Sequence, residues 1–371
     1  MRVLHVIPTL TGGGAEKFVC ALAAAFDTSS IRTAIMPVYP TVVPFDGEAS
    51  NRIELIHINR TGRYDPGFLM RMVSGMRRFR PDVVHAHLHN GKYWGRLVAL
   101  AARVPIVVFT EHSPLGEKRS LAESFVDGVV NRLSDGIVTF SERQRVALER
   151  AEHIPPEKLA VIENGISLPP PTDAVRRATA RARLGAREDE FSILVVGRLA
   201  DVKNPQLAIR AIAEIDVRVR RRVRLYMIGD GETAHTLRAL ARELHVTQSV
   251  AFMGHRDDVP DLLYGGDALF VPSFVEGMPL AVLEAMAVGL PVISSPWLGA
   301  QDLIGNGRFG VVLGDWTSAT AAKAIETAIQ SGDDFRHCGE RAQVFARARY
   351  DIRRSAQLHE RYYAELREQK T

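Results

Sequence analysis

Two glutamates, Glu276 and Glu284, flank a predicted helix start in the stretch SFVEGMPLAVLEAMAVGLPV. Pro279 suits the first helical position, because its φ is already fixed and the N–H that it lacks would have no partner there. Gly289 before Leu290-Pro291 is a typical helix stop. Glu276 then lies in the loop before the helix and Glu284 in its second turn, with the free N–H groups of the helix between them.

A carboxylate, an anion site and a second carboxylate therefore follow one another in space. In this order they could hydrogen-bond the sugar, the diphosphate and the ribose of a sugar nucleotide. The alternative gives Glu276 and Glu284 no ligand: the first would only complement the helix dipole and the second would be a solvated helix residue. The apolar neighbours of Glu284 favour partial burial, and therefore the first interpretation.

A glycine cluster, Thr11-Gly-Gly-Gly-Ala15, follows the first apolar run of the chain. Glycines let backbone N–H groups approach a phosphate closely. Lys17 occupies the place of the last glycine of G-x-G-x-x-G, and no G-x-x-x-x-G-K-[ST] motif occurs, so neither a dinucleotide site nor a P-loop is indicated. A phosphate contact at Gly13 and Gly14 and a simple tight turn both remain open.

Two basic residues, Arg198 and Lys203, lie in the segment VGRLADVKNP after another predicted strand. A guanidinium fork and an ammonium group together can hold a diphosphate. The alternative is a solvated loop pair, and the position at a strand end makes the diphosphate interpretation equally tenable.

Three histidines alternate in DVVHAHLHN, so His85, His87 and His89 share one face of an extended strand. This spacing can bind zinc, but no cysteine or carboxylate cluster is near, and no metal site is predicted. A strand-end histidine that meets a substrate is favoured over a structural one. Glu111 and His112 end the next strand and could face the same ligand, or be a solvated pair.

Arg71, Arg77, Arg78 and Arg80 lie on a predicted helix together with apolar residues, which include Phe68, Leu69, Met72, Val73 and Met76. Such a helix could contact anionic lipid. The favoured alternative is a helix that packs into the core and keeps a solvated basic face.

Alternating strands and helices must position these side chains. The first half contains predicted strands at Arg2–Ile7, Ile53–Ile58, Val83–His87, Ile106–Thr110, Gly136–Phe140 and Leu159–Ile162, with helical patterns between most of them. This alternation is typical of a Rossmann-like α/β domain with a parallel sheet.

The segment Leu168-Pro-Pro-Pro171 interrupts the alternation and is interpreted as a linker. The pattern then restarts, with a final amphipathic helix near Arg354–Glu368. The second half contains predicted strands at Ser192–Gly197, Arg224–Ile228, Ser249–Met253, Ala268–Pro272 and Pro291–Ser295, and helices near Pro205–Glu214 and Glu232–Leu244.

The composition agrees with two soluble α/β domains. A chain of 371 residues exceeds what one core usually supports. The net charge of +4 is too small to indicate a nucleic-acid partner. Cys20 and Cys338 lie far apart in a chain without a predicted signal peptide, which favours a reducing cytoplasm. No run of about 18 apolar residues indicates a membrane span.

These motifs together resemble the retaining GT-B glycosyltransferases of family four along nearly the whole chain. The E-x7-E pair is the most specific match, and VGRLADVKNP, LYMIGDGE, VIENGI and the early GGGA add independent ones. The resemblance implies two Rossmann-like domains that face each other across a cleft, with a C-terminal helix that returns to the first domain. The implied domains are 1–168 for the acceptor, 169–350 for the sugar nucleotide, and the helix at 351–371.

The resemblance also implies residue roles. Glu276 would contact the donor sugar and Glu284 the ribose, while Arg198 and Lys203 would bind the diphosphate and stabilise the departing nucleotide. His87 corresponds best to the family's active-site histidine. Further donor contacts are expected at Gly13, Gly14, Gly254, His255, Gly277, Met278, Pro279 and Leu280, and acceptor contacts at His89, Glu111 and His112.

The expected activity is retaining transfer of a sugar from a nucleotide-diphosphate sugar, with UDP preferred, to a glycan or polyprenyl-linked acceptor in cell-envelope polysaccharide or glycoconjugate synthesis. No metal or other cofactor and no nucleic acid are expected. The expected location is the cytoplasm, with peripheral contact at the inner face of the cell membrane. A sugar-nucleotide epimerase of the same two-domain plan and a catalytically silent sugar-nucleotide binding protein remain as alternatives.

Overall fold

The structure is a computed structural model that describes residues 1–41, 53–62, 64–112, 121–152, 154–305 and 307–370. The chain divides into two compact units. The first unit combines Met1–Ser167 with Tyr350–Thr371, and the second is Leu168–Arg349. Each unit is built around a parallel sheet of its own.

The sheet of the first unit has the order β3-β2-β1-β4-β5-β6-β7 among the described residues. The central strands are buried along their whole length, as expected for a parallel sheet with helices on both faces. The strands are β1 (Arg2–Ile7), β2 (Arg32–Pro37), β3 (Glu54–Leu55), β4 (Val83–His87), β5 (Ile106–Thr110), β6 (Gly136–Thr139) and β7 (Leu159–Val161).

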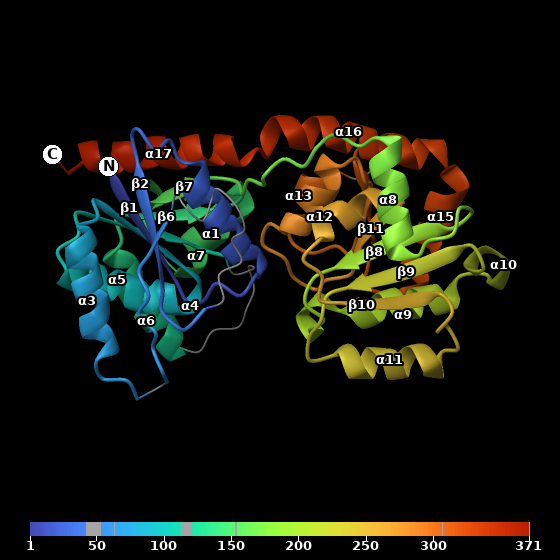
Figure 1. Cartoon of the computed structure of the whole chain (residues 1–371), viewed down its shortest axis with the longest axis horizontal. Coiled ribbons are helices and arrows are strands. Elements are labelled where there is room, and N and C mark those ends of the chain that lie inside the picture. The colour runs from blue at the N-terminus through green and yellow to red at the C-terminus, as the bar shows by residue number, and fades with distance from the viewer. Residues whose placement is uncertain (42–52, 63, 113–120, 153, 306, 371) are drawn as a thin grey trace. The chain divides into compact units, whose positions relative to one another are not determined.

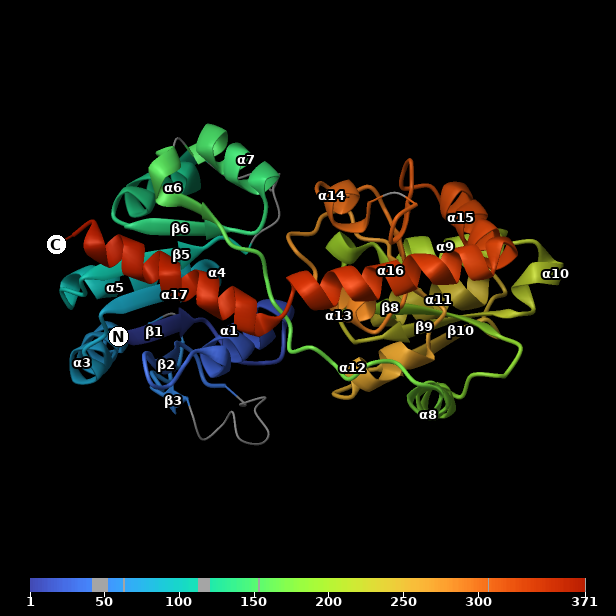
Figure 2. The same cartoon turned by 90° about the horizontal axis from the view of Figure 1, so that it is seen from above.

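The helix α17 (Ile352–Glu368) lies across this sheet, as Figures 1 and 2 show. Asp351 caps its N-terminus, and the N–H of Ile352 donates to the carbonyl of Ile166 at 2.9 Å. The other helices of the unit are α1 (Gly14–Ala25), α3 (Phe68–Phe79), α4 (Leu88–Asn90), the π-helical turn η1 (Gly91–Gly95), α5 (Arg96–Ala101), α6 (Leu121–Arg132), α7 (Glu142–Glu152) and η2 (Pro156–Lys158).

The sheet of the second unit repeats this strand order as β10-β9-β8-β11-β12-β13. Figure 1 shows α9 and α11 on one side of the sheet and α12, α13 and α16 on the other. The strands are β8 (Phe191–Val196), β9 (Val223–Ile228), β10 (Val250–Gly254), β11 (Ala268–Val271), β12 (Val292–Ser294) and β13 (Gly310–Val312).

The helices of the second unit alternate with its strands. They are α8 (Ala174–Leu184), η3 (Asp201–Lys203), α9 (Pro205–Glu214), α10 (Val217–Arg220), α11 (Ala234–Glu243), α12 (Val259–Leu262), η4 (Leu263–Gly265), α13 (Leu280–Ala287), α14 (Ala300–Ile304), α15 (Ser318–Ser331) and α16 (Asp333–Arg349).

The predicted α/β fold class is confirmed in both units. The predicted helix start at Pro279 was wrong by one position. Pro279 has ψ 117, so it is the N-cap and α13 begins at Leu280. Gly289 does follow the helix, with a positive φ of 82° that favours glycine.

The helix α3 packs into the core through Phe68, Met72 and Met76, which are buried. Arg77 and Arg78 are exposed on its other face. The predicted packing of this helix into the core is confirmed, and the exposed basic face leaves the lipid contact as a prediction. None of the helices in the described part of the chain is both long and apolar enough to cross a membrane.

Candidate active site

Three candidate residues of the second unit lie after two neighbouring strands, β8 and β11. β8 pairs with β9 on one side and with β11 on the other, so the strand order reverses here. Open α/β sheets bind ligands at the carboxyl ends of strands beside such a reversal. Arg198 and Lys203 follow β8, and Glu276 follows β11.

The two loops meet through Lys203 and Glu276. Lys203 Nζ lies 2.8 Å from Oε1 and 2.7 Å from Oε2 of Glu276. Ser273 donates its hydroxyl to Oε1 at 2.6 Å, and the N–H of Phe274 donates to the carbonyl of Val202 at 3.0 Å. The Glu276 side chain is only 8% exposed, so its charge is held by the ammonium group and not by water.

Local backbone geometry sets the position of Lys203. The chain turns sharply at Gly197 after β8, at a φ of 141° that favours glycine. Asn204, in the left-handed region at φ 48°, then ends η3 and caps α9. Pro205 occupies the first turn of α9, where a missing N–H costs no hydrogen bond.

The start of α13 adjoins Glu276. Gly277, Met278, Pro279 and Leu280 are partly exposed. Glu284 is also partly exposed and lies in the second turn of α13. The helix N-terminus, an anion site in general, therefore stands between the two glutamates, as the sequence predicts.

Other predicted donor contacts lie further out. Arg198 is exposed, on the loop that carries Lys203. Gly254 ends β10, an edge strand that is separated from β8 by β9. His255 is 69% exposed and lies 3.2 Å from Asp257. The proposed base contact at Gly254 and His255 remains a prediction.

In the first unit, His87 and His112 come together at the ends of β4 and β5. His87 Nδ1 lies 3.1 Å from His112 Nε2. His87 is fully buried and His112 is partly exposed. Burial lowers the pKa of His87 well below its usual value, and it lowers the pKa of His112 to about 4 although Glu111 opposes the shift. The active-site role of His87 remains a prediction, and His112 is the more exposed residue of the two.

Glu111 belongs to a buried ion cluster. Lys92 Nζ lies 3.5 Å from Glu111 Oε2 and 2.9 Å from Asp127 Oδ2, and all three side chains are at most 6% exposed. The Glu111 carboxylate therefore stabilises the fold through this buried ion pair. His89 is exposed and packs edge-on against Tyr93, with 4.8 Å between ring centroids. The predicted acceptor contacts of both residues remain predictions.

The glycine cluster holds an internal anion. The buried carboxylate of Glu16 accepts hydrogen bonds from the N–H groups of Thr11 and Gly13, each at 2.8 Å. Thr9 donates its hydroxyl to the same carboxylate at 2.5 Å. A phosphate at Gly13 would therefore compete with Glu16 for this N–H. Gly14, the first residue of α1, makes the alternative contact point.

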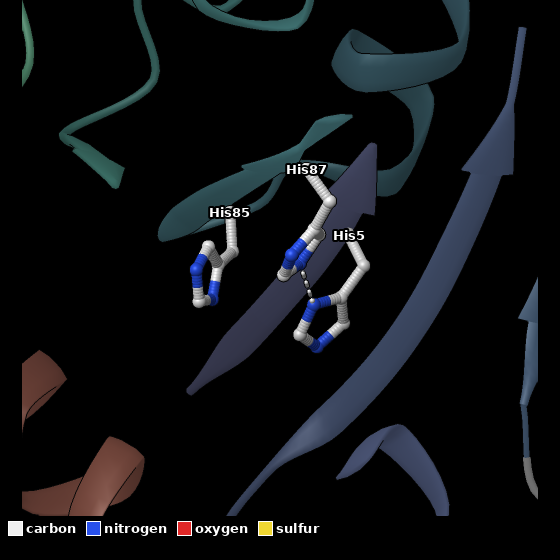
Figure 3. Close-up of side chains that lie close together, drawn as sticks. All are labelled: His5, His85 and His87. Carbon is white, nitrogen blue, oxygen red and sulfur yellow. Dashed lines mark hydrogen bonds between the residues drawn. The ribbon is translucent and has the colours of Figure 1, made fainter. Parts of the chain in front are cut away.

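His5, His85 and His87 face one another, as Figure 3 shows. Within the described part of the chain, they are the one group of three potential metal ligands whose donor atoms all lie within 4.8 Å. His85 already uses both nitrogens, at 2.6 Å from Tyr363 Oη and 2.6 Å from Thr110 Oγ1. An ion would have to displace these hydrogen bonds, and the absence of a metal site remains a prediction.

Two family models match the sequence. Residues 12–168 match the model described as Glycosyltransferase Family 4, and residues 176–345 match the model described as Glycosyl transferases group 1. Together they span the candidate residues of both units.

The chain belongs to glycosyltransferase family 4.

Curated relatives of this glycosyltransferase differ in the substrates that their names give. The UDP-Gal:alpha-D-GlcNAc-diphosphoundecaprenol alpha-1,3-galactosyltransferase of Escherichia coli is 28% identical over 246 residues, which cover 64% of this chain and 64% of that enzyme. The D-inositol 3-phosphate glycosyltransferase of Streptomyces bingchenggensis is 26% identical over 356 residues, which cover 87% of this chain and 78% of that enzyme.

Solved structures share the fold. HepE of Anabaena, in complex with UDP-glucose, superposes with a TM-score of 0.84 and 22% identity over 98% of this chain and 100% of that one. WaaG, a glycosyltransferase involved in lipopolysaccharide biosynthesis, gives 0.76 and 17% identity over 96% and 99%. This glycosyltransferase therefore has the GT-B fold.

Sequence reasoning missed three polar partners in this glycosyltransferase. Ser273 stands three positions before Glu276, and the S-x-x-E spacing was a usable signal for a serine–glutamate contact. Glu16 stands three positions after Gly13 in the same way. His5 had no local signal, because its partner His87 is 82 positions away in the sequence.

Proposed function

We propose that this glycosyltransferase transfers a hexose from a UDP-sugar, with retention at the anomeric carbon, to a polyprenyl-linked or glycan acceptor. The observation that carries the proposal is the contact of Lys203 with Glu276 beside the switch point of the second sheet. The names of the Escherichia coli galactosyltransferase and of the UDP-glucose complex of HepE support the choice of UDP.

In the proposed complex, Lys203 and Arg198 neutralise the diphosphate and stabilise the charge that develops on the departing nucleotide. Preorganised charges do this well, because they need no reorganisation during the reaction. Part of the proposal is that these two cations do so without a divalent metal. The N-terminus of α13 adds N–H groups for an anion, and Glu284 would accept a hydrogen bond from the ribose.

Glu276 would bind hydroxyls of the donor sugar. Its Oε1 accepts from Lys203 and Ser273 and its Oε2 from Lys203, so both oxygens are stabilised as hydrogen-bond acceptors. A carboxylate held in this way is a poor nucleophile. This supports attack by the acceptor on the same face that the nucleotide leaves, without a covalent glycosyl-enzyme.

The test compares UDP-, GDP- and ADP-sugars in a buffer with EDTA. We expect a rise in melting temperature with UDP-sugars, and slow release of UDP in the presence of an acceptor. Lys203→Ala and Arg198→Ala should each lower turnover by roughly 10- to 100-fold, the usual loss for a hydrogen bond to a charged group. Arg210→Ala is the matched control, because Arg210 is an exposed arginine on α9.

Other outcomes support other functions. Unchanged turnover in both variants would remove Lys203 and Arg198 from the mechanism. A 2-epimer of the donor that forms without an acceptor would indicate an epimerase. Donor binding without turnover over a broad acceptor panel would indicate a silent binding protein. A shift with GDP-sugars alone would overturn the choice of UDP.

A peripheral membrane contact through α3 belongs to the same proposal, since it would bring the enzyme to a lipid-linked acceptor. Arg77 and Arg78 are exposed, and Met70 is 74% exposed at the other end of the helix. We expect co-sedimentation with vesicles that contain anionic lipid, and its loss in Arg77→Glu/Arg78→Glu. Binding that is equal for neutral and anionic vesicles would contradict the electrostatic contact.

A further inference from the structure

Three imidazoles of the first unit form a continuous hydrogen-bonded chain. His5 Nδ1, on β1, lies 3.0 Å from His87 Nε2, on β4, and Figure 3 shows this link. His87 Nδ1 lies 3.1 Å from Nε2 of His112, the second residue after β5. His5 and His87 are fully buried, whereas His112 is partly exposed. The chain therefore runs from the core to a residue that is partly exposed.

All three rings are neutral at physiological pH. Burial lowers the pKa of His5 to about 3 and that of His112 to about 4, and it lowers that of His87 well below its usual value. A neutral imidazole has one N–H and one acceptor nitrogen. The direction of one hydrogen bond in the chain therefore fixes the direction of the other, and only two arrangements exist.

The buried end of the chain distinguishes the two arrangements. His5 Nε2 is buried and has no hydrogen-bond partner among the described residues. In one arrangement this nitrogen carries an unpaired N–H, and in the other it carries only an unpaired lone pair. Among buried backbone groups, an N–H without a partner is rarer than an acceptor without one, and the same preference applies to the two nitrogens of an imidazole. The arrangement with a lone pair on His5 Nε2, and the proton on Nδ1, is therefore favoured.

His359 on α17 provides a second example in the same cluster. Its Nδ1 lies 2.8 Å from the carbonyl oxygen of Ser355, which can only accept, so Nδ1 carries the proton. Its Nε2 is also buried without a partner among the described residues, and it must be a lone pair. The interior of this unit therefore already accommodates one unpaired imidazole acceptor.

We propose that His5 and His87 are positioning residues that hold His112 as the Nδ1–H tautomer. His5 Nδ1–H donates to His87 Nε2, so the proton of His87 lies on Nδ1 and donates to His112 Nε2. The proton of His112 must then lie on Nδ1. The ring of His112 packs edge-on against Phe18 and Phe140, at centroid distances of 6.3 and 5.4 Å, which fixes its plane.

The consequence is that His112 offers a hydrogen-bond donor and not a base. No described residue bonds to its Nδ1, and His112 is partly exposed as a residue at the carboxyl end of the sheet. Its ligand is an acceptor oxygen, a hydroxyl or phosphoryl oxygen of a substrate. This statement about the ligand rests on the proposed function, whereas the statement about the tautomer does not.

The tautomer is measured on the unchanged protein. Long-range proton–nitrogen NMR correlation on protein labelled with ¹⁵N-histidine shows which ring nitrogen carries the proton, and the signals missing in His112→Gln identify His112. We expect a protonated Nδ1 and an unprotonated Nε2 on His112 at pH 7.5. A protonated Nε2 would overturn the proposal.

Variants test the positioning role. His87→Leu removes the link, and we expect loss of the fixed tautomer and a fall in turnover of roughly 10- to 100-fold, by analogy with the loss of a partner that orients a metal-ligating histidine. His87→Asn keeps an N–H near Nδ1 and should restore both. His85→Gln is the control, because His85 lies on the same face of β4 outside the chain.

Equal turnover of the folded His87→Leu and His85→Gln proteins would overturn the positioning role. Titration with UDP and then with UDP-glucose distinguishes a phosphoryl oxygen of the nucleotide from a hydroxyl of the sugar as the ligand of His112. We expect the His112 Nδ1–H signal to shift with at least one of them or with the acceptor. If no sugar nucleotide binds at all, the proposed function fails while the tautomer result on the unliganded protein still stands.

Discussion

At the scale of single residues, the candidate donor site is stabilised by a pair of opposite charges before any ligand binds. Glu276 is almost fully buried, and a buried carboxylate without a partner is costly. The contacts with Lys203 and Ser273 offset this desolvation cost, and they also fix the directions of both carboxylate oxygens. A bound diphosphate would share the Lys203 ammonium group with Glu276, so the pair both orders the loops and sets the charge of the site.

Ser273 provides a test of this orientation. In Ser273→Ala the carboxylate keeps Lys203 but loses a short, charge-assisted hydrogen bond of 2.6 Å. We expect kcat/KM for sugar transfer to fall by roughly 10-fold or more, in the range typical of a hydrogen bond to a charged group. Steady-state kinetics with a UDP-sugar measures this, and Ser273→Thr should retain most of the activity.

Ser192→Ala is the matched control for that measurement. Ser192 is also fully buried and donates to a carboxylate, Glu190 Oε1 at 3.1 Å, but it lies at the start of β8, away from the carboxyl ends of the strands. Its loss should reduce stability and leave kcat/KM of the folded protein unchanged. If both serine variants lose activity equally, the effect is structural and the orientation of Glu276 does not matter.

At the scale of elements, the sequence predicted the central strands best. β1, β4, β5 and the helix α9 begin and end where their apolar patterns do. The edge of the first sheet was harder to predict. β2 was missed, and within the predicted strand Ile53–Ile58 only Glu54–Leu55 has strand geometry. Central strands are specified by their own burial, whereas the length of an edge strand depends on its one neighbour.

The second unit shows the same limit. β13 has only three residues, Gly310–Val312, and its pairing with β12 defines it as a strand. The long helices α15 and α16 were also missed. Position 339 in α16 requires glycine, because a Cβ at this position would lie 2.1 Å from the carbonyl oxygen of Gly289. This close approach to the end of α13 is tertiary and has no local signal.

The candidate sites were predictable only in part for a related reason. The rule that parallel sheets bind ligands at a reversal of strand order selects the ends of β8 and β11, and Lys203 and Glu276 do meet there. The first sheet has the same order, β3-β2-β1-β4, and its histidines lie on the strands beside the corresponding reversal. One side-chain pair in each site, His5 with His87 and Lys203 with Glu276, joins residues 70 or more positions apart, and no local pattern encodes such a contact.

At the scale of the whole molecule, the histidines make the stability of the two units differ in its dependence on acid pH. Desolvation lowers the pKa values of five histidines of the first unit, namely His5, His85, His87, His112 and His359. The histidines of the second unit are all exposed, namely His235, His245, His255 and His337. Protonation below neutral pH therefore opposes folding mainly in the first unit.

The pH window follows from these shifts. The unfolded value of 6.5 lies above the folded values, which are about 4 for His112 and His359 and about 3 for His5. Between these limits the unfolded chain binds more protons, so stability is complete above pH 6.5 and falls as the pH drops towards 4. Each such group contributes a slope of up to about 1.4 kcal/mol per pH unit. We therefore expect the first unit to lose its structure at a higher pH than the second.

The positions of the tryptophans make this measurable in the full chain. Trp94 lies in the first unit, and Trp297 and Trp316 lie in the second. On titration from pH 7.5 to 4.5, the wild-type emission should change while that of Trp94→Phe, which reports the second unit alone, stays nearly constant. His359→Gln should remove about one proton from the number taken up on unfolding, and so lower the slope of the unfolding free energy against pH. The exposed control His235→Gln should leave this slope unchanged. Simultaneous acid transitions in both units, or equal slopes in both histidine variants, would show that the buried cluster does not govern acid stability.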